Sequence, residues 1–391
     1  MYDQQGLRGW SRSRASVHII VGLAAAFAMV GCVLPPRPTL AAAGIRQHPG
    51  GDVVVPQSGG AGRGESGLSF RWDLKPTGID TDLPGLAAVS RMVVWASGSG
   101  GTVLRTVDGG KSWQNVSPIG AADQQFWDIE AFDSNNAVIL AKGPDARIYR
   151  TQDGGASWTL TFQNTDKHAA YDAISFSDRD HGLGLSDPVG GKFRIISTSD
   201  GGRTWQIVPT AGMPPALPHE FGFAFGGTEL VTLGNNAWFG TGIGREARVF
   251  HSADGGITWS AATTPIRTDN NSGIFSLAFR DSSTGLAVGG DLSALGAAVD
   301  AAALTSDGGT SWTLAGNPAP AGWRSGSAWV PSLRQTAIAV GTTGSDVSTD
   351  GGQTWRSFDT GSFYHVDCGR DGSCWASGAH GMVARLLVSQ I

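Results

Sequence analysis

The chain is poor in cysteine, charge and helical patterning. It has 3 cysteines in 391 residues, 16% of its residues are charged, and its net charge is −5. The lack of a basic surplus argues against nucleic acid or an anionic membrane surface as a partner. No helical periodicity of apolar residues appears after residue 31, which excludes helical and mixed α/β folds for the bulk of the chain. The 58 glycines instead fit many short strands and tight turns.

Motifs that mark common enzyme and cofactor classes are also missing. The sequence has no glycine fingerprint for a dinucleotide, no Cys-x-x-Cys-His haem attachment motif and no clustered histidines. We therefore expect no cofactor and no metal centre.

The first 32 residues have the pattern of a signal peptide. Three arginines between residues 8 and 14 precede an apolar stretch at 17–30 that is too short to span a membrane comfortably. Residues 29–32, Met-Val-Gly-Cys, resemble a lipobox, which would place a lipid on Cys32; the alanines at 41–43 offer an ordinary cleavage site instead. Lipidation and ordinary cleavage both predict an exported protein, in the periplasm or lipid-anchored to the cell envelope. Residues 33–67, rich in proline and glycine, are predicted to be a flexible linker.

The cysteine count fits this location. If Cys32 is lipidated or removed, Cys368 and Cys374 remain, and only five residues separate them in a predicted hairpin loop. Two cysteines this close in an oxidising compartment are expected to form a disulfide, and two buried thiols are the alternative.

One eight-residue phrase, Ser/Thr-x-Asp-Gly-Gly-x-Ser/Thr-Trp, occurs six times. The steps between its aspartates are 45, 47, 54, 53 and 43 residues. A period in this range indicates a repeat architecture, and here it favours a propeller. The aspartates are Asp108, Asp153, Asp200, Asp254, Asp307 and Asp350.

The phrase has a structural interpretation. Aspartate accepts backbone N–H bonds in a turn, and glycine adopts positive φ at no steric cost. The tryptophan is expected to pack the next strand against the neighbouring repeat. The phrase resembles the Asp-box of the bacterial neuraminidase repeat, a hairpin turn remote from the axial channel. That resemblance implies a structural role rather than catalysis or calcium binding.

Short strand-like segments surround each phrase, which predicts an all-β fold with four strands per repeat. After the last phrase, residues 375–385 mirror residues 95–105 and predict a seventh blade of three strands. Residues 68–72 can supply its missing strand, which leaves no exposed edge. We therefore expect a monomeric seven-bladed β-propeller over residues 68–391, closed by the N-terminal strand.

The repeats, blade count and export signal resemble the photosystem II assembly and stability factor family of seven-bladed Asp-box propellers. Segments such as 127–133, 274–281 and 344–346 resemble a bacterial, non-photosynthetic branch of that family. Photosynthetic members bind a precursor subunit through an arginine-rich surface. No matching arginine cluster is apparent in this sequence, so that partner is not carried over.

Candidate functional residues come from the loops that enter the innermost strands, because only these loops from several blades meet at the axis. They include Tyr171, His219, Ser276 and Tyr364. The positions expected to carry recognition are Asp128, Asp172, Glu220, Arg324 and His365. The loops between second and third strands add Asp145, Asp187, Asp291 and His380, of which the three aspartates are better explained as turn formers.

Three functions remain open. The preferred one is a binding or assembly scaffold that recognises a protein or peptide partner at the channel mouth, with no catalytic residues. The second is a glycoside hydrolase that uses paired channel carboxylates. Residues 193–196 resemble the sialidase Phe-Arg-Ile-Pro motif, but the proline is absent and the segment leads into a phrase at Thr198. The third is an oxygen-rich cation site built from the same acidic and histidine side chains.

Overall fold

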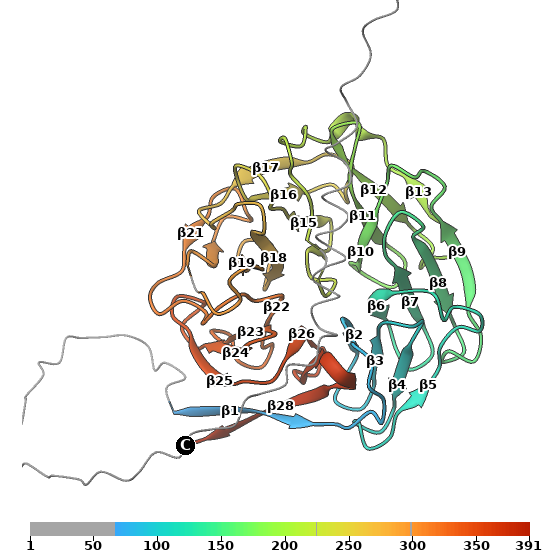
Figure 1. Cartoon of the computed structure of the whole chain (residues 1–391), viewed down its shortest axis with the longest axis horizontal. Coiled ribbons are helices and arrows are strands. Elements are labelled where there is room, and N and C mark those ends of the chain that lie inside the picture. The colour runs from blue at the N-terminus through green and yellow to red at the C-terminus, as the bar shows by residue number, and fades with distance from the viewer. Residues whose placement is uncertain (1–66, 224, 298) are drawn as a thin grey trace, which may run out of the picture. The chain divides into compact units, whose positions relative to one another are not determined.

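A computed structural model describes residues 67–223, 225–297 and 299–391. The predicted signal peptide, Cys32 and nearly all of the linker lie outside these residues. Figure 1 shows the described chain as seven four-stranded sheets arranged around a central axis. The helical content of the described residues is two short 3-10 turns, η1 (Thr210–Gly212) and η2 (Ala379–Gly381). The described residues include no helix with the length and apolarity needed to cross a membrane.

The first six blades follow one another in the sequence, and each blade pairs four consecutive strands. Blades 1 to 3 contain β2 (Gly85–Ala88), β3 (Val94–Ser97), β4 (Val103–Thr106), β5 (Gln114–Asn115), β6 (Phe126–Ala131), β7 (Ala137–Ala141), β8 (Arg147–Thr151), β9 (Thr159–Gln163), β10 (Tyr171–Phe176), β11 (Gly182–Val189), β12 (Lys192–Thr198) and β13 (Gln206–Ile207). Blades 4 to 6 contain β14 (Leu230–Leu233), β15 (Asn236–Gly240), β16 (Arg248–Ser252), β17 (Ser260–Thr263), β18 (Ser272–Phe279), β19 (Gly285–Asp291), β20 (Ala302–Thr305), β21 (Thr313–Leu314), β22 (Gly326–Trp329), β23 (Ala337–Gly341), β24 (Gly344–Ser348) and β25 (Arg356–Asp359).

The seventh blade joins the two ends of the described chain. Its strands are β26 (Phe363–Cys368), β27 (Cys374–Gly378), β28 (Val383–Gln390) and β1 (Leu68–Leu74). β1 runs antiparallel to β28, with a register from Leu68 opposite Gln390 to Leu74 opposite Ala384. The sequence predicts this pairing, and it covers the edge that β28 would otherwise expose.

The first strand of each blade lies innermost, and each of these seven strands contacts the next around a closed ring. Polar side chains bond neighbouring inner strands to each other. Asp128 on β6 accepts a hydrogen bond of 2.7 Å from Ile174 N on β10, and Ser325 donates one of 2.8 Å to Tyr364 O on β26. These bonds satisfy buried backbone groups that a neighbouring strand does not reach.

The repeated phrases form hairpin turns, as the sequence predicts. In the first, one oxygen of Asp108 accepts bonds of 3.0 Å from Lys111 N and Ser112 N, and the other accepts the Ser112 hydroxyl at 2.6 Å. The tryptophan at the end of each phrase packs against the preceding blade. Trp158 of blade 2 donates to Val116 O of blade 1 at 2.7 Å and packs in that blade's core cluster.

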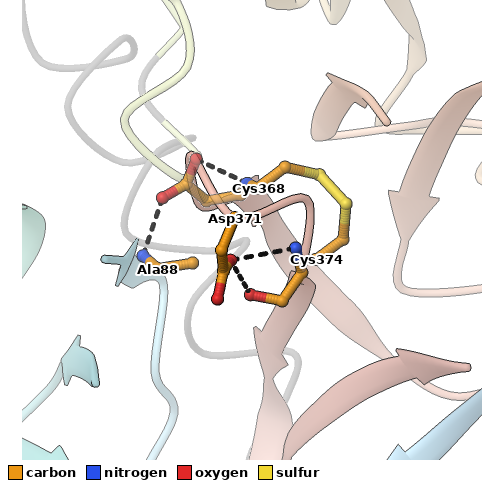
Figure 2. Close-up of a disulfide and its surroundings, with 6 residues drawn as sticks. Ala88, Cys368, Asp371 and Cys374 are labelled. Atoms are coloured by element: carbon orange, nitrogen blue, oxygen red, sulfur yellow. Dashed lines mark hydrogen bonds between the residues drawn. A yellow bond between two sulfur atoms is a disulfide. The ribbon is translucent and has the colours of Figure 1, made fainter. Parts of the chain in front are cut away.

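A disulfide joins Cys368 to Cys374 across the β26–β27 hairpin, in agreement with the sequence expectation (Figure 2). This hairpin also contacts blade 1 through two carboxylates. Asp367 accepts Ala88 N at 2.7 Å, and Asp371 accepts Arg91 N at 2.6 Å. The disulfide therefore lies at the junction where the last blade meets the first.

Candidate functional site

The channel mouth is crossed by the chain itself. Residues 222–229, called here the crossing segment and described except at 224, lead into β14 of blade 4 and contact three other blades. The ring of Phe225 lies 5.2 Å from that of Trp127 in blade 2, 5.1 Å from Trp323 at the entry of blade 6 and 6.0 Å from Tyr364 in blade 7. An aromatic cluster therefore occupies the position where entry loops would otherwise surround an open channel.

Two glycines allow this segment to lie against the inner strands. A Cβ added to Gly227 would lie 2.3 Å from Asp128 Oδ1, and one added to Gly226 would lie 3.0 Å from Tyr364 O. Both residues have positive φ, 75° and 146°. A side chain at either position would push the segment off the inner strands.

Glu220 is placed differently from the sequence expectation. The innermost strand of blade 4, β14, begins at Leu230 rather than next to Glu220. Glu220 is buried, and Arg248 binds both of its oxygens, Nε to Oε1 at 2.8 Å and Nη2 to Oε2 at 2.5 Å. Its carboxylate also accepts the Thr241 hydroxyl at 2.7 Å. These contacts make Glu220 an internal anchor of the insertion before β14.

Arg324 and His365 are also buried in internal contacts. Arg324 pairs with Asp346, with Nε and Nη2 at 2.7 and 2.6 Å from Oδ2. His365 Nδ1 lies 3.3 Å from Pro84 O, and burial lowers the pKa of His365 to about 4, which leaves its ring neutral at physiological pH.

Asp128 bonds to the backbone through both carboxylate oxygens. Oδ1 accepts Ile129 N at 2.9 Å and Oδ2 accepts Ile174 N. Burial raises the pKa of Asp128 to about 7, partly offset by these two bonds. Asp128 thus joins blades 2 and 3 rather than facing a ligand.

Asp172 lies in a cluster of charged groups that includes a lysine. The electrostatic neighbours of Asp172 are Lys142, Asp187 and Glu229, which come from blades 2, 3 and 4. Asp187 accepts Gly222 N of the crossing segment at 3.2 Å. Three carboxylates, one of them from this segment, and one ammonium group therefore meet here, and we call them the mouth cluster.

Burial dominates the titration of the mouth cluster. It raises the pKa of Asp172 to about 6, with Lys142 acting in the opposite direction. Burial, together with the neighbouring carboxylates, raises the pKa of Asp187 and of Glu229 well above their ordinary values. Glu229 is 1% exposed, and within the described chain neither of its carboxylate oxygens has a hydrogen-bond partner.

The four candidates from the loops between second and third strands have different surroundings. Asp291 forms a turn, accepting Ser293 N at 2.7 Å, as the sequence favours. Asp187 belongs to the mouth cluster, so its interpretation as a turn former is wrong. Asp145 is exposed, and His380 pairs with Asp80 at 2.7 Å on the surface. In the described ranges no three His, Cys, Asp or Glu side chains are placed to hold a metal ion.

A second site lies at the other end of the strands, on the face that carries the repeated turns. A pocket of about 140 Å³ between blades 2 and 3 is lined by Arg150, Arg179 and Arg203, with Asp180 as its one acidic residue. We call it the arginine pocket. It corrects the sequence interpretation, in which no arginine cluster is apparent. A groove of about 410 Å³, lined mainly by polar residues, follows between blades 3 and 4.

Arg150 is the innermost member of the arginine pocket. It is 9% exposed, and its Nε donates to Gly201 O at 2.7 Å. Among the described residues it has no carboxylate in an ion pair, whereas Arg179 pairs with Asp133 at 2.8 Å. Burial, and secondarily the nearby Arg203, lowers the pKa of Arg150. Asp200 acts on Arg150 electrostatically in the opposite direction but forms no ion pair with it in the described chain. A nearly buried guanidinium without a directly bonded carboxylate leaves donors for an anion from outside.

Sequence reasoning missed Lys142, Glu229 and the arginines, although two signals pointed to them. Arg150 directly precedes the second phrase, and Arg203 occupies the variable position inside the third. The 54-residue step from Asp200 to Asp254 is the longest of the five, and the insertion it implies contains the crossing segment and Glu229.

Comparison with known proteins agrees with this architecture. The family model for the BNR/Asp-box repeat matches residues 250–261, which contain the fourth phrase. The chain is a seven-bladed Asp-box β-propeller. A search of curated proteins finds no match.

Solved structures resemble this propeller at low sequence identity. A structure described as YCF48 bound to D1 peptide has a TM-score of 0.57 and 17% identity, covering 80% of this chain and 94% of that one. YCF48 from Cyanidioschyzon merolae has a TM-score of 0.55 and 16% identity, covering 80% and 98%. The GH74 xyloglucanase from Xanthomonas campestris has a TM-score of 0.58 and 13% identity, covering 81% of this chain but 53% of the enzyme. At these identities the likeness concerns the fold alone.

Proposed function

We propose that the protein is an exported scaffold that binds a protein or peptide partner, and that an acidic group of the partner docks in the arginine pocket. The observation that carries this proposal is Arg150, a nearly buried guanidinium that forms no ion pair among the described residues and lies beside Arg179 and Arg203. Arginine binds carboxylate through paired N–H donors, so this pocket suits an aspartate, a glutamate or a chain terminus.

The geometry of the pocket supports a converging set of donors. A methyl group built on Gly201 would lie 3.8 Å from Arg203 Nη1 and 3.9 Å from Arg150 Nη2. The two guanidinium groups therefore flank the same backbone position. The adjoining polar groove between blades 3 and 4 offers space for the residues next to the acidic group. The similar YCF48 structure with a bound D1 peptide supports peptide binding by this kind of propeller.

Binding of an acidic peptide to purified protein tests the proposal. The probe is a fluorescein-labelled peptide that alternates aspartate with glycine, and its control replaces each aspartate with asparagine. We expect the aspartate peptide to bind. We expect Arg150→Gln and Arg203→Gln each to weaken binding by about tenfold or more, because a hydrogen bond to a charged group is lost. Arg334→Gln, an exposed arginine away from the pocket, is the matched control.

Two results would reject this assignment. One is equal binding of the asparagine peptide, and the other is unchanged affinity in both arginine variants. Arg203 is exposed, so Arg203→Gln keeps the test valid if Arg150→Gln destabilises the fold.

The alternative function is a glycoside hydrolase, for which the GH74 likeness offers a fold but no residues. Such an enzyme needs one carboxylic acid and one base or nucleophile at the cleavage point. Asp128 is hydrogen-bonded to the backbone and Glu220 is paired with Arg248. Asp172 and Asp187 would therefore have to be the catalytic acid and the base or nucleophile. Turnover of β-glucan, xyloglucan, sialosides or peptidoglycan fragments that disappears in Asp172→Asn would replace the scaffold proposal with this one.

Export is part of the proposal and rests on residues 1–32 together with the disulfide. The Cys368–Cys374 bond suits an oxidising compartment. Mass spectrometry of the membrane fraction is expected to find an acylated N-terminal Cys32. A soluble protein that begins at Gly44 would instead indicate ordinary cleavage.

A further inference from the structure

Lys142 of the mouth cluster is held by an aromatic ring rather than by an acid. Its Nζ lies 3.3 Å from the centroid of the Trp127 ring. In the described part of the chain it forms no ion pair, although Asp172, Glu229 and Asp187 all act on it electrostatically. A lysine ammonium on the face of an indole ring is a cation–π contact. Trp127 is therefore a seat for a cation, and Lys142 occupies it.

The carboxylates around this seat outnumber the cation. Three acidic side chains act on one lysine, and Glu229 is 1% exposed with both carboxylate oxygens lacking hydrogen bonds among the described residues. A buried carboxyl group without partners is costly unless a donor or a cation reaches it. The cluster therefore has capacity for at least one further positive group.

The chemistry of the seat favours an organic cation over a metal ion. Among the described residues no set of acidic or histidine side chains is placed to hold a metal. The seat instead combines an indole face with nearby carboxylates, which suits ammonium and guanidinium groups. Phe225 of the crossing segment, whose ring lies 5.2 Å from that of Trp127, adds an apolar wall.

We propose that the channel mouth binds a lysine or arginine side chain of a partner, and that Lys142 occupies this seat in the free protein. The incoming cation lies on Trp127 and faces Asp172 and Asp187. Trp127, Lys142 and both aspartates are partly exposed, so a side chain can reach them.

This site is distinct from the arginine pocket. Lys142 follows the end of β7, whereas Asn136 of the pocket precedes its start, so the two sites lie at opposite ends of one strand. The inference does not depend on the proposed binding of acidic peptides. One partner that carries both charges could contact both faces, but each site is tested with its own peptide.

The test uses anisotropy of a fluorescein-labelled peptide that alternates lysine with glycine. Its control is the same peptide with every lysine acetylated, which keeps the length and removes the charge. Lys142→Met keeps the apolar stem and vacates the seat, so we expect the lysine peptide to bind about threefold to tenfold more tightly, a range suited to one cation–π contact. Asp172→Asn is expected to weaken binding by a similar factor. The matched control is Asp145→Asn, which makes the same change in charge. Asp145 is exposed on the β7–β8 hairpin that also carries Lys142, and this variant is expected to leave binding unchanged.

Three outcomes would overturn the proposal. They are equal binding of the acetylated peptide, wild-type affinity in a folded Asp172→Asn variant, and no tightening in Lys142→Met. If Asp172→Asn fails to fold, the Lys142→Met result decides alone. A parallel peptide of arginine and glycine with the same ranking of variants supports a seat for guanidinium as well as ammonium.

Discussion

The carboxylate of Asp128 on β6 accepts the backbone N–H of Ile174 on β10, and this bond of 2.7 Å joins the innermost strands of blades 2 and 3. Asp367 on β26 makes the equivalent contact to Ala88 on β2, where the last blade meets the first. Asp128, which looks like a channel ligand in the sequence, thus acts as a connector between blades, as Asp367 does.

Removing the Asp128 connector is expected to destabilise the ring. In Asp128→Ala the N–H groups of Ile174 and Ile129 lose their acceptor while buried. We expect the free energy of unfolding to fall by about 1–3 kcal/mol, the cost of an unsatisfied buried donor. Urea denaturation at pH 5 measures the change, with exposed Asp123→Ala as control. Equal stability of the two variants would contradict a connecting role.

The same carboxyl group predicts how stability depends on pH. Burial raises the pKa of Asp128 to about 7 from 3.8, so the folded chain holds this proton more tightly than the unfolded chain. Stability from this group is therefore full below pH of about 4 and is lost as the pH rises to about 7. Burial raises the pKa of Glu130 and of Asp367 as well, which acts in the same direction.

Urea denaturation of wild type and Asp128→Asn at pH 5, 6, 7 and 8 checks this dependence. The asparagine variant is expected to lose less stability across the series. The turn carboxylate Asp108 acts in a separate window, because hydrogen bonds from Ser112 hold its pKa near 2 and its contribution is lost only below pH of about 4. If the free energy of unfolding of wild type and of Asp128→Asn changes equally with pH above pH 5, Asp128 does not cause the pH dependence.

The repeated turns depend on a buried hydroxyl as much as on the aspartate. Thr151 is 1% exposed; its Oγ1 accepts Gly155 N at 2.9 Å and donates to Asp153 at 2.8 Å. Thr151→Val keeps the volume and removes both bonds, which we expect to cost about 1–3 kcal/mol. Thermal and urea unfolding measure the loss against Thr159→Val, an exposed position on β9. A loss no larger than that of the control would mean that the aspartate alone holds the turn.

The N-terminal strand is expected to be required for solubility. A chain that begins at Gly67 retains β1, whereas a chain that begins at Lys75 lacks it and exposes β28 as an unpaired edge. The shorter chain also loses Trp72, whose Nε1 donates to Ser345 Oγ at 2.9 Å in blade 6. Size-exclusion chromatography should show a monomer for the first and aggregates for the second. Equal monomer fractions would disprove the need for closure.

Reduction of the disulfide should loosen the junction of blades 7 and 1. The bond closes a short loop between Cys368 and Cys374 that also carries Asp371. Loop-closure entropy for so short a loop gives a stabilisation of about 2 kcal/mol. We expect urea denaturation with and without dithiothreitol to differ by this amount, and hydrogen exchange at Ala88 and Arg91 to rise after reduction. Unchanged hydrogen exchange at both amides would show that the disulfide does not stabilise the junction of blades 7 and 1.

The fold was predictable because its determinants are local and repeated. Each Asp-Gly-Gly turn specifies a hairpin on its own, and six of them with one period define the blades. The strand at 68–72 was predictable by elimination, since the last blade lacked a partner for β28. The Cys368–Cys374 bond followed from a separation of six residues.

The site was less predictable because it depends on where one blade departs from the repeat. Glu220 was assigned to strand entry on the assumption that blade 4 resembles its neighbours, but β14 begins only at Leu230. The intervening residues cross the mouth, and contacts such as Phe225 with Tyr364 join parts of the chain that no local pattern relates. The mouth cluster likewise takes Lys142 and Glu229 from different blades.

The pairing of β1 with β28 also sets an order of events during synthesis. Ser69 and Ser389, which share a hydrogen bond of 2.8 Å, are 320 residues apart in the sequence. At about 5–20 residues per second, the ribosome needs roughly 16 to 64 s between making these two residues. β1, the first strand of the described chain to be made, is therefore the last of its strands to find its partner. Until then it remains an unpaired segment that a chaperone or another chain can capture.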